Sequence, residues 1–212
     1  MLTASHNPPE YNGYKVYWQD GGQLVPPQDK AIIEEINRLQ YEEINFNAKE
    51  SLIQLLDDSS ENAFAKASVQ NGSLKSSGKA RKNLRIVFTP LHGTSITMVP
   101  KVLKEAGYTD VHIVEEQAVP DGNFSTVSSP NPEEPEALQM ALDLAKKINA
   151  DLVIGTDPDC DRLGIAVRNP QAAMQLLNGN QTMVIMTDFL LNYHQKNQSL
   201  PKGSFIASTI VS

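Results

Sequence analysis

Three aspartates on alternate residues are the part of this 212-residue sequence with the clearest chemical potential. Asp157, Asp159 and Asp161 stand between two short apolar runs, at residues 152–154 and 163–167. Both runs are typical of buried strands, which predicts that the carboxylates share a tight loop. Three carboxylates held this close repel one another unless a cation lies among them. The spacing therefore predicts a site for a divalent metal ion.

Other acidic motifs fit the loop less well. An EF-hand calcium loop requires Gly at its sixth position and Glu at its twelfth, where this chain has Arg162 and Arg168. A haloacid-dehalogenase-type phosphatase has Thr or Val where this chain has Asp161. A solvated acidic turn without metal is the remaining alternative, and the apolar flanks argue against it. Carboxylates disfavour a thiolate at Cys160, so we expect this thiol to be inert.

The composition limits the classes of partner. Hydrophobic residues make up 40% of the sequence and charged residues 20%, which is typical of a globular protein. The formal net charge of −7 argues against nucleic acid as a partner, because nucleic-acid binding requires a basic surface. No apolar run approaches the roughly 20 residues that span a bilayer, and the N-terminus lacks a signal-peptide pattern. One cysteine permits no internal disulfide. We therefore expect a cytoplasmic protein with no nucleic-acid and no membrane partner.

The elements that must position the aspartates alternate between strand and helix. Strands are predicted at residues 84–88, 111–114 and 151–155, and helices at residues 95–106 and from Asn131 to about 148. This order predicts an α/β fold, a three-layer sandwich with a mostly parallel mixed sheet. Ligands of such sheets bind beyond the carboxyl ends of the strands, where the aspartate loop stands. A helix at about 181–194 and a strand at 205–210 are predicted to follow.

The N-terminal third is predicted to be less regular. A strand is expected at residues 15–18, and helices at 29–40, 48–57 and 61–69. Residues 71–83 contain Asn-Gly and Ser-Gly turns and few apolar side chains, so they mark the best boundary. The basic side chains in this segment, Lys75, Lys79, Arg81 and Lys82, are interpreted as solvated linker rather than as a binding patch. Residues 92–94, His-Gly-Thr, either bind a phosphate or turn the chain, and we favour the turn.

Two motifs together resemble a known family. The sequence Thr-Ala-Ser-His-Asn-Pro begins at Thr3, and Asn-Gly-Tyr-Lys follows and ends at Lys15. Asp-Pro-Asp-Cys-Asp-Arg runs from Asp157 to Arg162. In this order the motifs resemble the α-D-phosphohexomutase family of phosphoglucomutases and phosphomannomutases. Further resemblance, most like the phosphoglucomutase and phosphopentomutase branch, covers residues 21–24, 88–94, 120–124, 130–133 and 177–181.

The resemblance implies a metal-assisted phosphoserine centre. Ser5 matches the serine that carries the phosphoryl group. Asp157, Asp159 and Asp161 match the ligands of Mg²⁺, and an oxygen of the phosphorylated Ser5 completes the protein's contribution. Phosphoryl transfer requires charge neutralisation and positioning, which hard oxygen ligands and a divalent cation supply.

Three further residues are assigned through the same resemblance. Arg162 matches an arginine beside the phosphoserine, Lys15 matches a lysine that transfers protons, and His6 lies in the phosphoserine loop. The implied substrate is a sugar phosphate, with a bisphosphorylated sugar as activator. The implied reaction moves phosphate between the 1- and 6-positions of a hexose, or the 1- and 5-positions of a pentose. A hydroxyl loses a proton in each half-reaction, which requires a general base.

The resemblance also implies a division of the chain. Residues 1–75 correspond to the end of an incomplete α/β first domain with the phosphoserine loop and linker, residues 80–200 to the second domain with the metal loop, and residues 201–212 to the first strand of a third domain. The family has four domains, so we expect this truncated chain to be inactive by itself. Two alternatives stay open: a non-catalytic fragment that binds metal or self-associates through exposed edges, and a metal-dependent phosphatase.

Overall fold

A five-stranded mixed sheet forms the centre of the computed structural model, which describes residues 1–72, 74 and 76–207. The strand order is β2-β1-β3-β4-β5. The strands are β1 (Arg85–Thr89), β2 (Asp110–Ile113), β3 (Leu152–Thr156), β4 (Leu163–Arg168) and β5 (Met174–Leu177). β1 pairs in parallel with β2 and β3, whereas β3, β4 and β5 pair antiparallel. The predicted α/β fold is confirmed, with antiparallel strands completing one side of the sheet.

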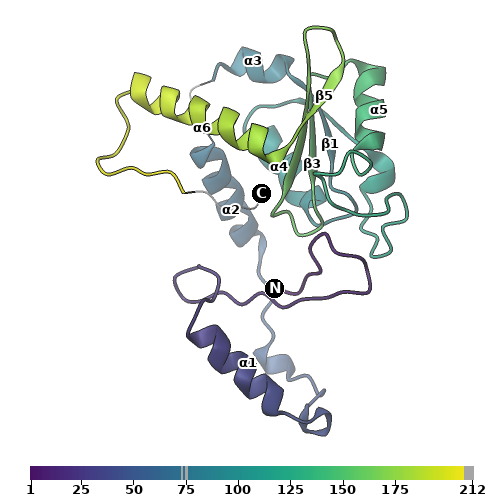
Figure 1. Ribbon diagram of the computed structural model, residues 1–212, viewed down its shortest axis with the longest axis vertical. Coiled ribbons are helices and arrows are strands. Elements are labelled where there is room, and N and C mark those ends of the chain that lie inside the picture. The colour runs from purple at the N-terminus through teal and green to yellow at the C-terminus, as the bar shows by residue number, and fades with distance from the viewer. Residues whose placement is uncertain (73, 75, 208–212) are drawn as a thin grey trace.

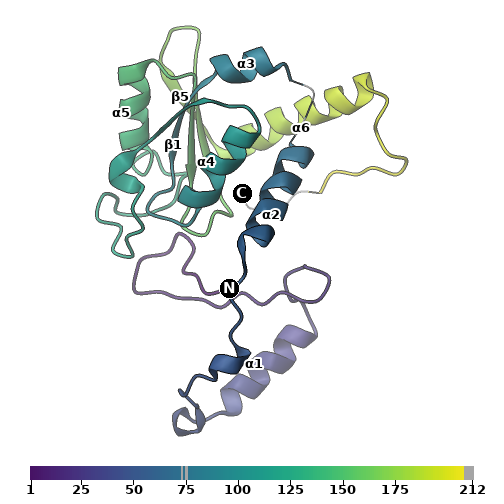
Figure 2. The same ribbon diagram turned by 180° about the vertical axis from the view of Figure 1, so that it is seen from behind.

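Helices cover both faces of the sheet (Figures 1 and 2). One face carries α5 (Gln139–Ile148), which contacts β1, β3 and β5. The other face carries α4 (Ser95–Glu105) and α6 (Gly179–Lys196), with α2 (Asp58–Asn71) packed on α4 and α3 (Gly78–Asn83) leading into β1. The main core cluster lies between α5 and the sheet and consists of Val87, Val114, Ala141, Ala145, Ala150, Val153 and Ala166.

The expected helix from Asn131 is wrong at its start. Helix α5 begins eight residues later, at Gln139, and residues 131–138 form turns. Pro135 explains the difference, because it lacks a backbone N–H and disfavours the helical conformation of the residue before it. The turn segment also packs closely against strand β4, since a Cβ on Gly164 would lie 2.0 Å from the carbonyl oxygen of Pro132. Strand β5 was not predicted from the sequence.

The N-terminal segment is less regular than predicted. In place of a strand at 15–18, the structure has isolated bridges between Leu2 and Tyr14 and between Tyr17 and Gln23. The helix expected at 48–57 is reduced to a 3-10 turn at Glu50–Leu52, and a further 3-10 turn lies at Tyr41–Glu43. Within the described residues, only these isolated bridges, and no regular strand, lie beside the two segments. Their apolar side chains therefore lack a sheet on which to pack.

Four of the predicted helices are confirmed, at α1 (Gln28–Arg38), α2, α4 and α6. The apolar face of α1 remains exposed in the structure, with Ile33 and Ile36 more than half accessible. A strand was predicted at 205–210, but residues 205–207 form no strand and residues 208–210 lie outside the described residues. Lys75, one of the basic side chains of the predicted linker, also lies outside the described residues. No helix in the described part of the chain combines the length and apolar character needed to cross a membrane.

Asp151 ties three strands together at the end of the sheet opposite the aspartate loop. Its Oδ2 accepts a hydrogen bond of 2.9 Å from the backbone N–H of Arg85, and its Oδ1 accepts one from the Arg168 guanidinium. The Arg85 N–H holds the pKa of the Asp151 carboxyl below its usual value, against the opposing effect of partial burial, with Arg168 adding to the lowering. The ionised carboxylate therefore stabilises the folded state.

Substituting Asp151→Asn is expected to lower the free energy of unfolding by about 1 kcal/mol at pH 7. A lowered folded-state pKa gives stability that is present above the unfolded pKa, about 3.9, and that is lost as the pH falls through the folded pKa. The deficit should therefore disappear in acid. Urea unfolding at pH 7 and near pH 3 measures it, with Asp58→Asn as the exposed control. A deficit that does not change with pH contradicts the ionic origin.

Candidate functional site

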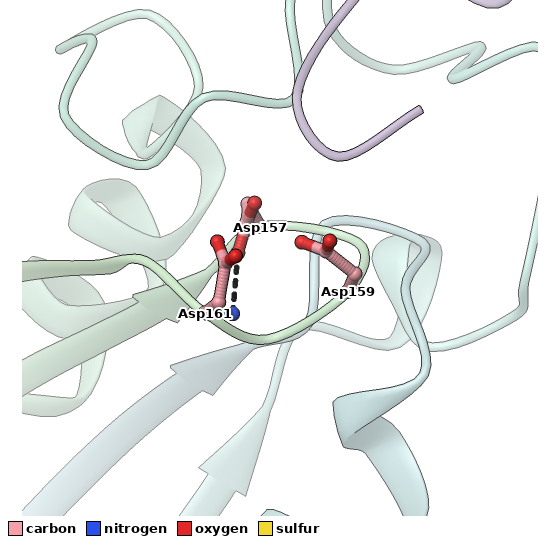
Figure 3. Close-up of side chains that lie close together, drawn as sticks. All are labelled: Asp157, Asp159 and Asp161. Carbon is pink, nitrogen blue, oxygen red and sulfur yellow. Dashed lines mark hydrogen bonds between the residues drawn. The ribbon is translucent and has the colours of Figure 1, made fainter. Parts of the chain in front are cut away.

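The three aspartates lie in the loop that connects β3 to β4. The last pair of the antiparallel ladder joins Thr156 to Leu163, so only six residues bridge the two strands. One carboxylate oxygen from each aspartate lies within 4.8 Å of the others, and Figure 3 shows the three carboxyl groups converging. The loop turns sharply at Cys160, whose φ of 62° is in the left-handed region. The predicted clustering of the carboxylates is therefore present.

Asp157 is the buried member of the group and organises the loop around itself. Its Oδ1 accepts hydrogen bonds from the backbone N–H groups of Asp161, at 3.0 Å, and of Arg162, at 2.9 Å. Burial, with the neighbouring Asp159 carboxyl as the second cause, raises the pKa of Asp157 to about 6. Holding this group ionised is therefore costly, and a nearby cation would relieve that cost.

Lys15 supplies a cation to the other two carboxylates. Its Nζ lies 2.8 Å from Asp159 Oδ2 and 2.7 Å from Asp161 Oδ2. Hydrogen bonds to Asp159 and then Asp161 raise the pKa of Lys15 well above its usual value. Burial alone would raise the pKa of Asp159, but the ammonium group of Lys15 outweighs it, so that the pKa is lowered. Lys15 is thus held protonated in this arrangement.

Asp159 also has an unsatisfied oxygen. Its side chain is 6% exposed, and its Oδ1 is buried without a hydrogen-bond partner. A buried carboxylate oxygen without a partner is costly, and a bound cation is one way to satisfy it. Three carboxylates form an all-oxygen donor set, which suits Mg²⁺ or Ca²⁺ rather than a soft transition metal. The donor set and the unsatisfied oxygen fit a hard divalent cation.

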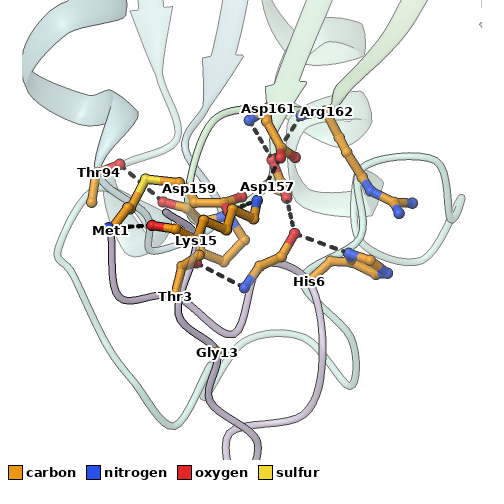
Figure 4. A network of polar contacts seen from close by, with 12 residues as sticks. Met1, Thr3, His6, Gly13, Lys15, Thr94, Asp157, Asp159, Asp161 and Arg162 are labelled. Atoms are coloured by element: carbon orange, nitrogen blue, oxygen red, sulfur yellow. Dashed lines mark hydrogen bonds and ion pairs between the residues drawn. The ribbon is translucent and has the colours of Figure 1, made fainter. Parts of the chain in front are cut away.

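Ser5 lies directly against this group although it is 152 residues away in sequence. Its Oγ donates a 2.9 Å hydrogen bond to Asp157 Oδ2 and lies 3.2 Å from His6 Nδ1 (Figure 4). Its backbone N–H donates to Thr3 Oγ1 at 2.8 Å. The φ of Ser5 is 53°, an uncommon conformation for a residue with a side chain and one that is concentrated at functional sites.

The N-terminal strand-like pairing brings Lys15 to the same place. The terminal ammonium of Met1 donates to the Lys15 carbonyl at 2.8 Å, and the Lys15 N–H donates to the Met1 carbonyl at 2.9 Å. Arg162 contacts the group through its backbone N–H, and Figure 4 shows its side chain extending toward the side where His6 lies. All seven residues singled out from the sequence are therefore in or beside one cluster.

The turn after β1 contributes contacts that were not assigned to the site from the sequence. Thr94 donates two hydrogen bonds to the Pro158 carbonyl, from its N–H at 2.9 Å and from its Oγ1 at 3.0 Å. His92 is buried, and its ring nitrogens lie 2.9 Å from the Val119 carbonyl and 2.8 Å from Thr126 Oγ1. The favoured interpretation of residues 92–94 as a turn agrees with these contacts. The feature of the sequence that could have indicated these contacts is the His-Gly-Thr turn directly after a predicted strand.

Partial burial and the Asp157 carboxylate raise the pKa of the Cys160 thiol, which agrees with an inert cysteine.

Taken together, the contacts of Ser5, Lys15 and the three aspartates define a candidate reactive centre. It contains a serine hydroxyl, three carboxylates and an ammonium group. This combination is suited to transferring an anionic group onto an oxygen nucleophile beside a cation.

Comparison with known proteins places the chain in a family. The family description "Phosphoglucomutase/phosphomannomutase, alpha/beta/alpha domain II" matches residues 62–171, and the corresponding description of domain I matches residues 1–43. The chain belongs to the phosphoglucomutase/phosphomannomutase family. It is 40% identical over 218 residues to a phosphoglucomutase of Staphylococcus aureus (strain MRSA252), with all of this chain and 38% of that protein aligned.

Two solved structures share the fold. A Thermus thermophilus protein aligns over 91% of this chain and 40% of its own, with a TM-score of 0.73 and 24% identity. A phosphoglucomutase/phosphomannomutase family protein from Burkholderia thailandensis aligns over 90% of this chain and 37% of its own, with a TM-score of 0.65 and 22% identity. At these identities the likeness concerns the fold alone.

Proposed function

We propose that this chain carries the phosphoryl-transfer centre of a phosphoglucomutase-type isomerase, an intramolecular phosphotransferase. The observation that carries the proposal is the 2.9 Å hydrogen bond from Ser5 Oγ to Asp157 Oδ2, which joins the two motifs. The chain spans 38% of the length of the Staphylococcus phosphoglucomutase. For the whole protein we propose isomerisation of a sugar phosphate, in which phosphate moves between the 1- and 6-positions of a hexose or between the 1- and 5-positions of a pentose.

In this proposal Asp157, Asp159 and Asp161 would hold Mg²⁺, together with an oxygen of the phosphorylated Ser5. The metal ion would neutralise charge on the phosphoryl group during transfer. Asp157 orients the Ser5 hydroxyl through the hydrogen bond described above. The unsatisfied Oδ1 of Asp159 and the all-oxygen donor set support the choice of a hard cation.

Lys15 is proposed to exchange a proton with the sugar hydroxyl. Two carboxylates hold it protonated in the present arrangement, so it can accept a proton only when its contacts with them are loosened. His6, within 3.2 Å of Ser5 Oγ, and Arg162 are proposed to stabilise the anionic phosphoryl group. The two half-reactions then use the same groups in opposite directions.

We propose the same division of the chain into domains that the resemblance implies. Residues 1–75 provide the phosphoserine loop and linker of a first domain, residues 80–200 the second domain with the metal loop, and residues 201–212 the start of a third. Helix α2, within which the match to domain II begins at residue 62, packs on α4 of the second domain. A cytoplasmic location, a sugar phosphate substrate and a bisphosphorylated sugar as activator belong to the same proposal.

Phosphorylation of Ser5 is the direct test. Full isomerisation is not expected of this chain by itself, but incubation with a hexose 1,6-bisphosphate and Mg²⁺ should place one phosphoryl group on the peptide that contains Ser5, as read by mass spectrometry. Ser5→Ala should abolish this transfer, because it removes the accepting oxygen, whereas the control Ser204→Ala should leave it unchanged. Release of inorganic phosphate without a phosphoserine would instead favour a metal-dependent phosphatase.

A further inference from the structure

The turn that follows β1 lies in direct contact with the aspartate loop. A Cβ on Gly93 would lie 2.4 Å from Pro158 Cα and 2.7 Å from the Pro158 carbonyl oxygen. Real Cβ atoms do not approach backbone atoms this closely, so any side chain at residue 93 would push the two segments apart. Gly93 is therefore required for the close approach of the two loops.

Thr94 fixes the same point of the loop by hydrogen bonding. A carbonyl oxygen can accept two hydrogen bonds, and that of Pro158 accepts both from Thr94. The donors are the Thr94 backbone N–H, at 2.9 Å, and its Oγ1, at 3.0 Å. Pro158 stands between Asp157 and Asp159, so the position of its carbonyl sets how far apart these two carboxylates lie. The two bonds and the proline ring leave this peptide little freedom.

The turn is itself held firmly. The His92 N–H donates to the Gln117 carbonyl at 2.9 Å, and its ring is bound on both nitrogens. Ser95 Oγ lies 2.6 Å from Thr156 Oγ1 in a buried contact that joins the start of α4 to the end of β3. Gly93 and Thr94 thus hold a firmly anchored turn against Pro158.

We propose that Gly93 and Thr94 are positioning residues that set the Asp157–Asp159 spacing for a small cation and so determine selectivity for Mg²⁺ over Ca²⁺. Mg²⁺ requires near-octahedral ligands at about 2.0–2.1 Å, whereas Ca²⁺ accepts flexible geometry at about 2.3–2.6 Å. A loop held at fixed spacing favours the smaller ion, and a loosened loop accepts the larger. The inference rests on the proposed metal site and adds what gives that site its selectivity.

The test compares two glycine substitutions in the whole chain. Gly93→Ala should weaken Mg²⁺ binding by about tenfold and Ca²⁺ binding by less than about threefold, as measured by calorimetric titration with each ion. Gly122→Ala is the matched control, since a Cβ there meets nothing within 4 Å, and it should leave both affinities unchanged. Thermal unfolding without metal shows whether each variant is folded.

Thr94 gives a second and milder test, which does not depend on Gly93→Ala folding. Thr94→Val removes the Oγ1 hydrogen bond and should lower the ratio of Mg²⁺ to Ca²⁺ affinity by about threefold to fivefold. Thr94→Ser keeps the hydroxyl and should restore the original ratio. A general loss of stability would reduce both affinities equally and would not be rescued by serine.

The outcomes separate this inference from the metal site on which it rests. Equal losses for the two ions, or no change in either, overturn the positioning role and leave the metal site standing. If the unsubstituted chain binds neither Mg²⁺ nor Ca²⁺, the proposed metal site is wrong and the inference falls with it. An unchanged ratio in Thr94→Val also overturns the role of Thr94.

Discussion

Replacing Asp159 with asparagine is expected to weaken Mg²⁺ binding by roughly 100-fold or more. The substitution keeps the shape of the side chain but removes one of three ligand charges. Loss of a hydrogen-bond partner outside the ligands typically costs ten- to hundred-fold in metal affinity, and loss of a ligand costs at least as much. Asp159 is the sharpest choice because its Oδ1 is buried and has no other partner.

Without metal, the same variant should be folded. The proximity of Asp159 to the buried Asp157 carboxyl costs stability in the unsubstituted chain. The substitution removes this repulsion, which offsets the loss of the ion pair with Lys15, and it leaves one buried polar atom at residue 159 without a partner as before. Calorimetric titration with Mg²⁺ measures the affinity, and Asp58→Asn controls for a change in net charge. An undiminished affinity in Asp159→Asn would mean that Asp159 is not a ligand of the metal ion.

Replacing Lys15 with methionine should act in the opposite direction, and raise the affinity for Mg²⁺ by about tenfold. The ammonium group lies within 2.8 Å of two proposed ligands, so a metal ion must displace it or tolerate its charge nearby. Two like charges a few ångströms apart repel by roughly 1–2 kcal/mol even when water screens them, which corresponds to about tenfold. Methionine keeps most of the apolar length without the charge.

The metal-free stability of this variant should fall, because Lys15 is the only cation with a side-chain ion pair to these carboxylates among the described residues. Thermal unfolding with EDTA and with Mg²⁺ therefore gives a crossed pattern: a lower midpoint than the unsubstituted chain without metal, and a larger increase on adding it. Lys30→Met, on exposed helix α1, is the control. Weaker Mg²⁺ binding in Lys15→Met would mean that Lys15 holds the loop in its binding geometry.

The two substitutions together bear on how the centre would work. The contacts of Lys15 with Asp159 and Asp161 are the cause of its raised pKa, so loosening them would lower that pKa. The ammonium group then becomes a better proton donor, and its neutral form a more accessible acceptor. The two contacts would therefore govern the proton exchange proposed for Lys15.

Helix α6 exposes several apolar side chains, including Val184, Ile185 and Phe189. Such a surface favours self-association, which stays a prediction and can be tested by sedimentation at several concentrations. A concentration-dependent mass would support the alternative in which the chain assembles with itself. It would not by itself decide whether Ser5 accepts a phosphoryl group.

The sequence by itself determined the loop and the strands beside it. The apolar runs at 152–154 and 163–167 are each contiguous, and the carboxylates between them are close because six residues leave no room for separation. Strands β1 and β2 and helix α4 were predicted for the same reason, since each has a clear local pattern. The sequence did not predict β5, a four-residue strand with little pattern, or the late start of α5, where Pro132 and Pro135 intervene.

The tertiary structure alone decided how the parts of the site meet. The motifs around Ser5 and Asp157 were associated through their resemblance to a family, but neither composition nor periodicity specifies a 2.9 Å contact across 152 residues. The contact of Gly93 with Pro158 is of the same kind, because it depends on β1 and β3 pairing in parallel and bringing their carboxyl ends to one edge. Local patterns fix what each segment becomes, whereas contacts between distant segments depend on how the whole sheet packs.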